Sequence, residues 1–168
     1  MKKKAKKKRT ARGLTAADIM QRKVVVVGPS DTLEEAMALM TEHHVSGLPV
    51  LNARDKCIGV ISATDIMNFE QEQSEWGIDG DDLSAFFDPQ THRWEMIRVR
   101  SGGEDLPDVC VREVMSRELV SVKPTTPVKT VAQKMLDEDI HRVLVMDDNQ
   151  YLHGIISAMD FVRLYAGQ

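Results

Sequence analysis

The sequence is poor in aromatic residues and contains no long apolar run. Aromatic residues make up only 5% of the 168 positions, so we expect a core of aliphatic side chains supplemented by the ten methionines. The apolar runs, such as 24–27 and 48–51, are far shorter than the roughly 20 apolar residues that a membrane-spanning helix needs. We therefore expect no transmembrane segment. With 42% hydrophobic and 29% charged residues, the composition is typical of a globular protein.

The sequence also has few cysteines and lacks the common catalytic motifs. The two cysteines, Cys57 and Cys110, are too few for the disulfide framework of a secreted protein and fit a protein of the reducing cytoplasm. The chain has no CxxC or HExxH pattern, no nucleophile elbow and no phosphate-binding glycine loop. We therefore expect no metal site, no catalytic residue and no required cofactor.

One end of the chain is strongly basic, whereas the remainder is acidic. Residues 1–12 carry eight Lys or Arg and no acidic residue, whereas the remainder has 14 basic and 26 acidic side chains. The acidic remainder is a poor electrostatic partner for nucleic acid, which is polyanionic. We expect 1–14 to be a solvated, disordered tail. The alternative is that the tail binds nucleic acid by releasing counterions.

The chain repeats itself at an interval of 95 residues. The register holds without a gap from about residue 18 to residue 67, which indicates a duplicated structural unit. The identical pairs include Met20/Met115, Val25/Val120, Val27/Val122, Pro29/Pro124, Met40/Met135, Val50/Val145, Gly59/Gly154, Ser62/Ser157 and Asp65/Asp160.

Each repeat predicts the element order β-α-β-β-α. Short β-rich runs over 24–27 and 119–122 end at a proline, and apolar residues at helical spacing follow over 33–40 and 128–135. Two strands come next, over 48–51 and 57–61 in the first repeat and over 143–146 and 152–156 in the second. A last helix begins near Ala63 and Ala158. Gly59 and Gly154 lie inside strand patterns, where a close backbone approach is the usual reason for glycine.

These elements predict an α/β fold made of two similar units. We expect a first repeat over 15–70, an insertion over 71–107 and a second repeat over 108–166. One repeat alone would be marginally stable, because so small a domain buries too little surface. Two repeats that share a face solve this problem, and the duplication predicts a pseudo-two-fold axis.

Two pairs of segments carry a family resemblance. HHVSGLPVLN and IHRVLVMDDN, followed at the same spacing by GVISATD and GIISAMD, resemble the CBS domain family, named after cystathionine β-synthase. The resemblance implies that the two repeats form one Bateman module and that such modules pair as homodimers. It also implies that clefts between repeats bind AMP, ADP, ATP or S-adenosylmethionine, and that the module regulates a partner protein rather than performing chemistry.

The residues themselves also point to a nucleotide site. Asp65 and Asp160 each follow a strand at the start of a helix, where a partly exposed carboxylate can accept hydrogen bonds from both ribose hydroxyls. The alternative is that each carboxylate only caps its helix. Ser62, Thr64 and Ser157 offer hydroxyls beside the same helix starts, which favour anions.

The resemblance implies two unequal sites, each combining groups from both repeats. The first joins hydroxyl and carboxylate groups to a cationic segment that suits phosphate: Ser62, Thr64, Asp65, Ile140, His141 and Arg142. The second comprises Ser157, Asp160, Val45, Ser46 and Gly47. We expect the second site to be weaker, because Met159 stands where the first has Thr64, and Ser46–Gly47 stands where the first has His141–Arg142. Val25 and Val120 are predicted as apolar walls against adenine or, equally, as plain core residues.

The insertion is acidic at its start and contains half of the eight aromatic residues: Trp76, Phe86, Phe87 and Trp94. Such content indicates some packing, as a lid or a dimer brace; a surface for a partner is the alternative. We expect 93–100 to form an edge strand or a short helix.

We therefore expect a cytoplasmic, homodimeric Bateman module that senses an adenine nucleotide and is not an enzyme. A nucleic-acid-associated accessory protein that uses the basic tail is the alternative function.

Overall fold

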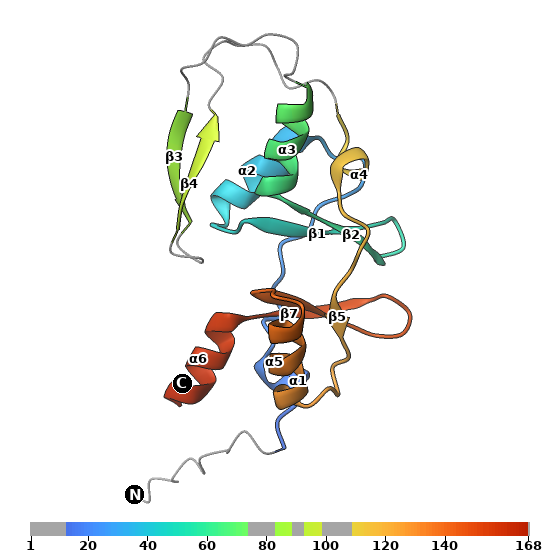
Figure 1. Ribbon diagram of the computed structural model, residues 1–168. Helices are drawn as coiled ribbons and strands as arrows, with labels where there is room; N and C mark the ends of the chain where they lie inside the picture. Colours follow the sequence, from blue (N-terminus) through green and yellow to red (C-terminus); the bar gives the residue numbers. More distant parts are fainter. Residues whose placement is uncertain (1–12, 74–82, 89–92, 99–108, 168) are drawn as a thin grey trace, which may run out of the picture. The chain divides into compact units, whose positions relative to one another are not determined.

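The computed structural model describes residues 13–73, 83–88, 93–98 and 109–167, with only the backbone described between 70 and 98. The expected α/β fold with two similar units is confirmed (Figure 1). One compact unit comprises Met1–Val24 and Val120–Gln168, and the other comprises Val25–Leu119. We call them the second-repeat unit and the first-repeat unit, and describe each by itself.

The first-repeat unit is built on an antiparallel pair of strands, β1 (Gly47–Leu51) and β2 (Cys57–Ser62). Helices α2 (Leu33–Glu42) and α3 (Ala63–Gln73) contact this pair and each other, and the short α4 (Val111–Val114) contacts β2 and α3. Their core is almost entirely aliphatic, as the composition predicts: Val27, Leu33, Ala36, Met40, Leu48, Val50, Ile61, Ile66 and Val111.

The second-repeat unit has a three-stranded sheet in the order β5 (Ser121–Val122), β6 (Arg142–Met146) and β7 (Leu152–Ser157). Strand β5 runs parallel to β6, and β7 runs antiparallel to it. The helices of this unit are α1 (Ala16–Ile19), α5 (Val128–Asp137) and α6 (Ala158–Ala166). The core consists of Ala16, Met20, Val122, Val131, Met135, Val143, Val145 and Ile156.

Two strands are described within the insertion. Strand β3 (Leu83–Asp88) pairs antiparallel with β4 (Arg93–Arg98), so the alternative of a short helix over 93–100 is wrong. Helix α3 ends at Gln73, and Trp76 lies outside the described residues. The side chains of Phe86, Phe87 and Trp94 also lie outside the description, so the role of the insertion stays a prediction. The basic residues 1–12 lie outside it as well.

The short segment at the start of each repeat, here called its leading segment, packs on the other repeat. Helix α1 begins the first repeat, yet Ala16 and Met20 belong to the core of the second-repeat unit. Helix α4 begins the second repeat, yet Val111 belongs to the core of the first-repeat unit. The attachment includes backbone pairing at equivalent places: Gln21 exchanges two hydrogen bonds with Ile155 (2.9 and 3.0 Å), and Ser116 exchanges two with Val60 (both 2.9 Å).

The two strand glycines lie where these leading segments cross the sheet. A Cβ atom on Gly154 would lie 2.6 Å from the carbonyl oxygen of Gln21. A Cβ atom on Gly59 would lie 2.6 Å from Met115 Sδ and 2.9 Å from the carbonyl oxygen of Ser116. The prediction of a close backbone approach at both glycines is therefore confirmed.

The predicted strand over 24–27 is wrong, and a proline explains why. Only Val27 pairs, in an isolated parallel bridge with Val50. In the second repeat the equivalent run forms the short β5, next to which Leu144 donates its N–H to the carbonyl oxygen of Val120 (3.3 Å). The residue equivalent to Leu144 is Pro49, which has no N–H, so this hydrogen bond has no counterpart beside Val25.

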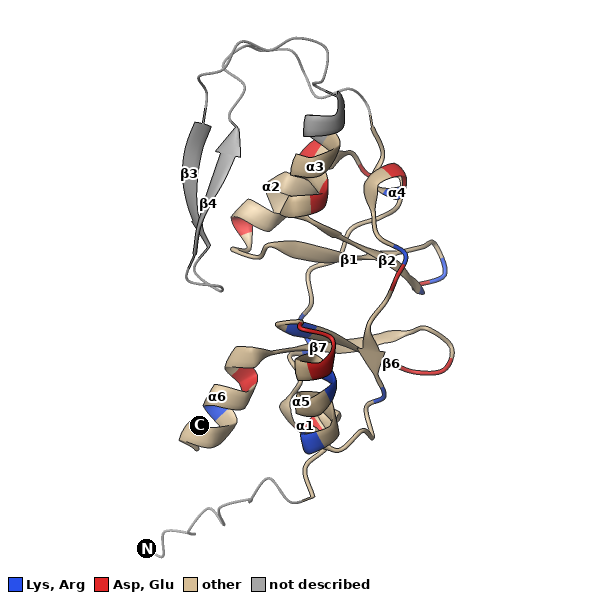
Figure 2. Cartoon of the chain, in the orientation of Figure 1, with Lys and Arg blue, Asp and Glu red and all other residues tan. Residues whose placement is uncertain are grey.

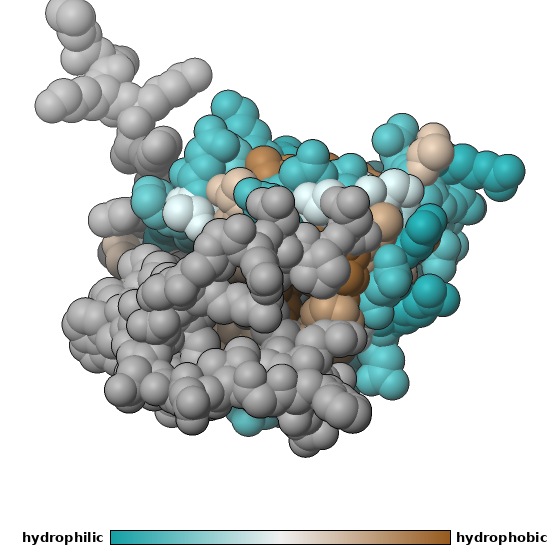
Figure 3. All heavy atoms as spheres, turned by 90° about the horizontal axis from the view of Figure 1, so that it is seen from above, coloured by the Kyte–Doolittle hydropathy of each residue, from teal (hydrophilic) through white to brown (hydrophobic). Residues whose placement is uncertain are grey.

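Carboxylates stand in the first turns of several helices (Figure 2), where the helix dipole favours negative charge. They are Asp18, Glu34, Glu35, Asp65, Glu113 and Asp160. Thr32 caps α2 by accepting a hydrogen bond from the Glu35 N–H (3.1 Å). On the face drawn in Figure 3, most of the described surface is hydrophilic.

The turns between the central strands are equivalent but not identical. Asn52 Oδ1 accepts hydrogen bonds from the N–H groups of Arg54 and Lys56 (2.9 and 3.1 Å). Asp147, its equivalent, accepts from the N–H groups of Asn149 and Tyr151 (2.9 and 3.0 Å). A side-chain hydrogen bond with His153 (3.1 Å) lowers the pKa of Asp147 below its ordinary value.

Candidate functional site

The carboxylate of Asp65 lies in the first turn of α3, immediately after β2. Its Oδ2 atom accepts hydrogen bonds from the N–H (2.8 Å) and the hydroxyl (2.6 Å) of Ser62, and Ser62 Oγ accepts one from the Asp65 N–H (3.2 Å). This is a reciprocal cap in which each side chain serves the other's backbone. The Oδ1 atom of the half-buried Asp65 accepts no hydrogen bond from any described residue. The carboxylate thus caps the helix, and within the described part of the chain its second oxygen has no donor.

The segment before β1 lies directly beside this carboxylate's strand and helix. Gly47 pairs with Ser62, and the N–H of Ala63 donates to the carbonyl oxygen of Ser46 (3.0 Å). A Cβ atom on Gly47 would lie 3.2 Å from the Ile61 carbonyl oxygen, so the two backbones approach closely here. The first-repeat unit therefore brings together the predicted site residues Ser62, Thr64, Asp65, Val45, Ser46 and Gly47, with the Thr64 side chain exposed.

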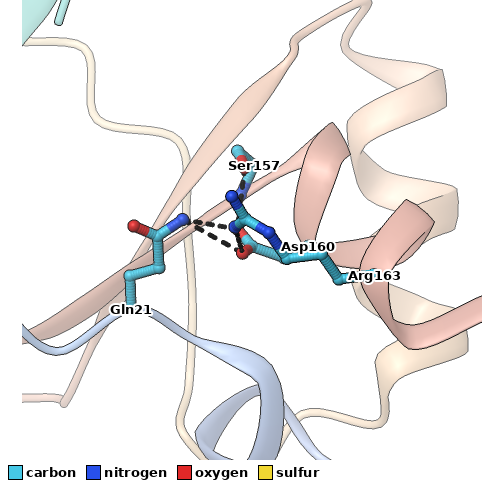
Figure 4. A network of polar contacts seen from close by, with 4 residues as sticks. All are labelled: Gln21, Ser157, Asp160 and Arg163. Atoms are coloured by element: carbon cyan, nitrogen blue, oxygen red, sulfur yellow. Dashed lines mark hydrogen bonds and ion pairs between the residues drawn. The ribbon is translucent and has the colours of Figure 1, made fainter. Parts of the chain in front are cut away.

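The equivalent carboxylate, Asp160, has a different environment. It accepts from the N–H and the hydroxyl of Ser157, both at 2.7 Å on Oδ2, just as Asp65 does from Ser62. In addition, Gln21 Nε2 donates to Oδ1 (3.0 Å) and lies 3.3 Å from Oδ2, and Arg163 Nη1 donates to Oδ1 (3.0 Å). Figure 4 shows Gln21 and Arg163 converging on Asp160. Asp160 is only 6% exposed.

The predicted phosphate-binding segment lies beside this second carboxylate. Arg142 pairs with Ser157, and the N–H of Ala158 donates to the His141 carbonyl oxygen (3.0 Å). Ile140 is half-buried against the core of the second-repeat unit, and the His141 side chain is exposed. The second-repeat unit therefore brings together Ile140, His141, Arg142, Ser157 and Asp160.

The predicted adenine walls are partly buried core residues in their own units. Val25 packs against the core of the first-repeat unit, and Val120 packs against that of the second-repeat unit. The prediction that joins Asp65 with Arg142, and Asp160 with Ser46, combines residues of both units and stays a prediction.

Sequence reasoning missed Gln21 and Arg163. Gln21 is 139 residues away from Asp160 in sequence, and a local sequence pattern cannot predict so distant a contact. The one available signal is the repeat itself, because the positions equivalent to Gln21 and Arg163 hold Ser116 and Asn68. That difference predicts unlike surroundings for the two carboxylates, but only the structure shows that Gln21 and Arg163 donate hydrogen bonds to Asp160.

No residue among those described is placed for metal or redox chemistry. No three His, Cys, Asp or Glu side chains gather there as a metal site would require. Cys57 is fully buried, and this burial raises the pKa of its thiol, so it behaves as a small core residue.

Comparison with known proteins identifies the family of this fold. A family model described as the CBS domain matches residues 16–72 and 111–167, which correspond to the two repeats. The chain belongs to the CBS domain family.

Among curated CBS relatives, an uncharacterized protein of Methanocaldococcus jannaschii, MJ1426, is 29% identical over 154 residues, covering 87% of this chain and 88% of its own length. An uncharacterized protein of Methanopyrus kandleri, MK0525, is 24% identical over 153 residues. The match covers 91% of this chain but only 63% of that relative.

Solved structures share the CBS-pair fold. The structure of CBSX2 in complex with AMP superposes with a TM-score of 0.65 at 22% identity, covering 92% of this chain and 97% of that one. The CBS domain pair of MJ0100, in complex with 5-methylthioadenosine and S-adenosyl-L-methionine, gives a TM-score of 0.64 at 21% identity, with the same coverage. No helix in the described part of this chain is both long and apolar enough to cross a membrane.

Proposed function

We propose that this protein is a regulatory module that binds an adenosine-containing ligand, such as AMP, ADP, ATP or S-adenosylmethionine, through Asp65. In this proposal the module forms a homodimer and acts on a partner protein when the ligand is bound. The module itself performs no chemistry. The complexes of CBSX2 with AMP and of MJ0100 with adenosyl ligands support this ligand class.

The observation that carries the proposal is that Oδ1 of Asp65 accepts no hydrogen bond from the described residues. An ionised carboxylate offers about four acceptor positions on its two oxygens. Ser62 uses those of Oδ2, and no described residue uses those of Oδ1. A ribose has two neighbouring hydroxyls that donate hydrogen bonds, so Asp65 has the acceptor capacity that a nucleoside requires.

The surroundings of Asp65 support a phosphorylated ligand. The first turn of α3 leaves backbone N–H groups without helical partners, and the helix dipole favours anions there. The exposed hydroxyl of Thr64 lies in the same turn. We propose that the phosphate is also held by His141 and Arg142 with Ile140 beside them, because a guanidinium presents a planar fork of donors to phosphate. Val25 and Val120 are proposed to contact the adenine.

The substitution Asp65→Asn tests the proposal with the helix cap preserved. The amide oxygen of asparagine still accepts from Ser62, but its NH₂ group cannot accept from a ribose. Hydrogen bonds to a charged group contribute roughly 1.5–3 kcal/mol, so we expect Asp65→Asn to weaken binding by roughly ten- to a hundred-fold. Isothermal titration calorimetry with AMP, ADP, ATP and S-adenosylmethionine measures the effect on ligand-free protein.

Two further variants make this measurement specific. Arg142→Ala is expected to weaken AMP binding strongly, and Asp160→Asn to change it little. The absence of binding by the wild-type protein to all four ligands would refute the proposed function. Equal losses in the Asp65, Arg142 and Asp160 variants would contradict the assignment of the ligand to Asp65.

A further inference from the structure

The two equivalent carboxylates differ in how many of their acceptor positions are occupied. From the described residues, Asp65 receives two hydrogen bonds, both on Oδ2 and both from Ser62. Asp160 receives the equivalent two from Ser157 and two more on Oδ1, from Gln21 and Arg163. All four acceptor positions of Asp160 are therefore used within the protein.

The two additional donors are specific to the second-repeat unit. Position 116 is equivalent to Gln21 and holds serine, whose Oγ accepts from the Glu118 N–H (3.3 Å). Position 68 is equivalent to Arg163 and holds asparagine. Among the described residues, neither Ser116 nor Asn68 bonds to Asp65.

One of the two donors, Arg163, is positively charged. Arg163 forms an ion pair with Asp160 at 3.0 Å, one helical turn away on α6, where the Arg163 side chain is 54% exposed and that of Asp160 only 5%. The bond from Arg163 joins two oppositely charged groups, whereas a ribose hydroxyl is an uncharged donor, so a ribose hydroxyl is a poor competitor for Oδ1. Gln21 is anchored as well, because its backbone exchanges two hydrogen bonds with Ile155.

We propose that Gln21 and Arg163 keep Asp160 closed to external ligands, so that the chain binds one adenosine-containing ligand, through Asp65, rather than two. The second half of this statement rests on the proposed function, whereas the closure of Asp160 does not. Gln21 and Arg163 are thereby the residues that set the number of ligands per chain.

The internal repeat supplies the matched variant. The double substitution Gln21→Ser and Arg163→Asn gives Asp160 the side chains that stand at the equivalent positions of the first-repeat unit, Ser116 and Asn68. The reciprocal pair, Ser116→Gln and Asn68→Arg, gives Asp65 those that surround Asp160. Circular dichroism confirms that each variant is folded before it is tested.

The first measurement needs no ligand. Full-length protein is treated with a water-soluble carbodiimide and glycinamide, which amidates accessible carboxylates, and peptides are quantified by mass spectrometry. In the wild type we expect amidation of Asp65 and little of Asp160. In the Gln21→Ser/Arg163→Asn protein, Asp160 should be amidated to the extent of Asp65. Equal labelling in the wild type, or continued protection of Asp160 in the variant, would overturn the closure.

The second measurement is the stoichiometry of AMP binding by calorimetry. We expect one AMP per chain in the wild type and two in the Gln21→Ser/Arg163→Asn protein. The reciprocal variant should lose AMP affinity by roughly ten-fold or more. Two AMP per chain in the wild type, or one in a variant whose Asp160 is labelled, would overturn the role of the two donors. If the wild type binds no AMP while the labelling is as expected, the proposed function fails and the closure of Asp160 stands.

If the double variant does not fold, the two single variants still test the proposal. Gln21→Ser and Arg163→Asn each remove one of the two donors to Oδ1, and each should raise the labelling of Asp160 above that of the wild type. No increase in either single variant would overturn the proposal.

Discussion

At the scale of single residues, a methyl group added to Gly154 has no space. Its position would lie 2.6 Å from the carbonyl oxygen of Gln21, which Ile155 holds by backbone pairing. At Gly59 the nearest atom is the sulfur of Met115, at the flexible end of a side chain, and the backbone oxygen of Ser116 would lie farther away, at 2.9 Å. Overpacking of this kind costs roughly 1–3 kcal/mol, so we expect Gly154→Ala and Gly59→Ala both to lower the free energy of unfolding.

The two glycine variants serve as controls for each other. Because a side chain can move more easily than a paired backbone, Gly154→Ala should be the more damaging of the two. Urea denaturation followed by circular dichroism measures both. A Gly154→Ala protein as stable as the wild type would show that the leading segment is not held against β7 as described.

Much at this scale can be predicted from the sequence, and the reason is distance along the chain. The caps of α3 and α6 depend on residues three apart, so Ser62 and Asp65 are recognisable as a pair. The strand glycines are likewise recognisable by their place in a strand pattern. The bond from Gln21 to Asp160 joins residues 139 apart, and such a contact depends on the whole fold.

At the scale of elements, the leading segment of the chain stabilises the repeat that is farther away in sequence. Leu14, Ala16 and Met20 are buried in the second-repeat unit, and Leu14 accepts a backbone hydrogen bond from Val128 (2.9 Å). We expect deletion of residues 1–24 to destabilise the second-repeat unit selectively. Hydrogen–deuterium exchange should show faster exchange in α5, β6 and β7, while β1, β2 and α2 keep their protection.

The control for this deletion is a protein that lacks only residues 1–12. It retains every described residue of the leading segment, so its exchange in α5, β6 and β7 should match the wild type. Faster exchange of β1 and β2 after deletion of 1–24 would contradict the assignment of the leading segment to the second-repeat unit.

The order and type of the elements follow from the sequence better than the pairing of strands does. Helices α2 and α5 coincide with the predicted apolar spacing, and the four longer central strands with the predicted apolar runs. The run of valines over 24–27 has every local property of a strand. It forms a single bridge because a neighbouring strand, through Pro49, lacks a donor at the position where the second repeat has one.

At the scale of the whole molecule, the basic tail separates the two candidate functions. All residues of the proposed ligand site lie outside residues 1–12, so we expect deletion of 1–12 to leave the affinity for AMP within about two-fold of the wild type. A nucleic-acid-associated protein would instead retain DNA in a filter-binding assay. That retention would fall with salt and disappear with the deletion. DNA retention lost together with the tail, alongside no AMP binding, would favour this alternative.

The duplication could be predicted at this scale, but the exchange of leading segments could not. Helices α1 and α4 begin equivalent parts of the two repeats, and each buries small apolar residues. The same pattern would arise if each helix packed on its own repeat. Only the structure shows that Val111 lies in the core of the first-repeat unit and Ala16 in that of the second.

This exchange sets the order in which the protein can be completed during translation. The first-repeat unit has all its parts once residue 119 has left the ribosome. The second-repeat unit needs residues 14–24, which emerge early, and residues up to 166, which emerge late. At roughly 5–20 residues per second, the leading segment waits at least several seconds, with Leu14 and Met20 uncovered, before its docking surface has been synthesised.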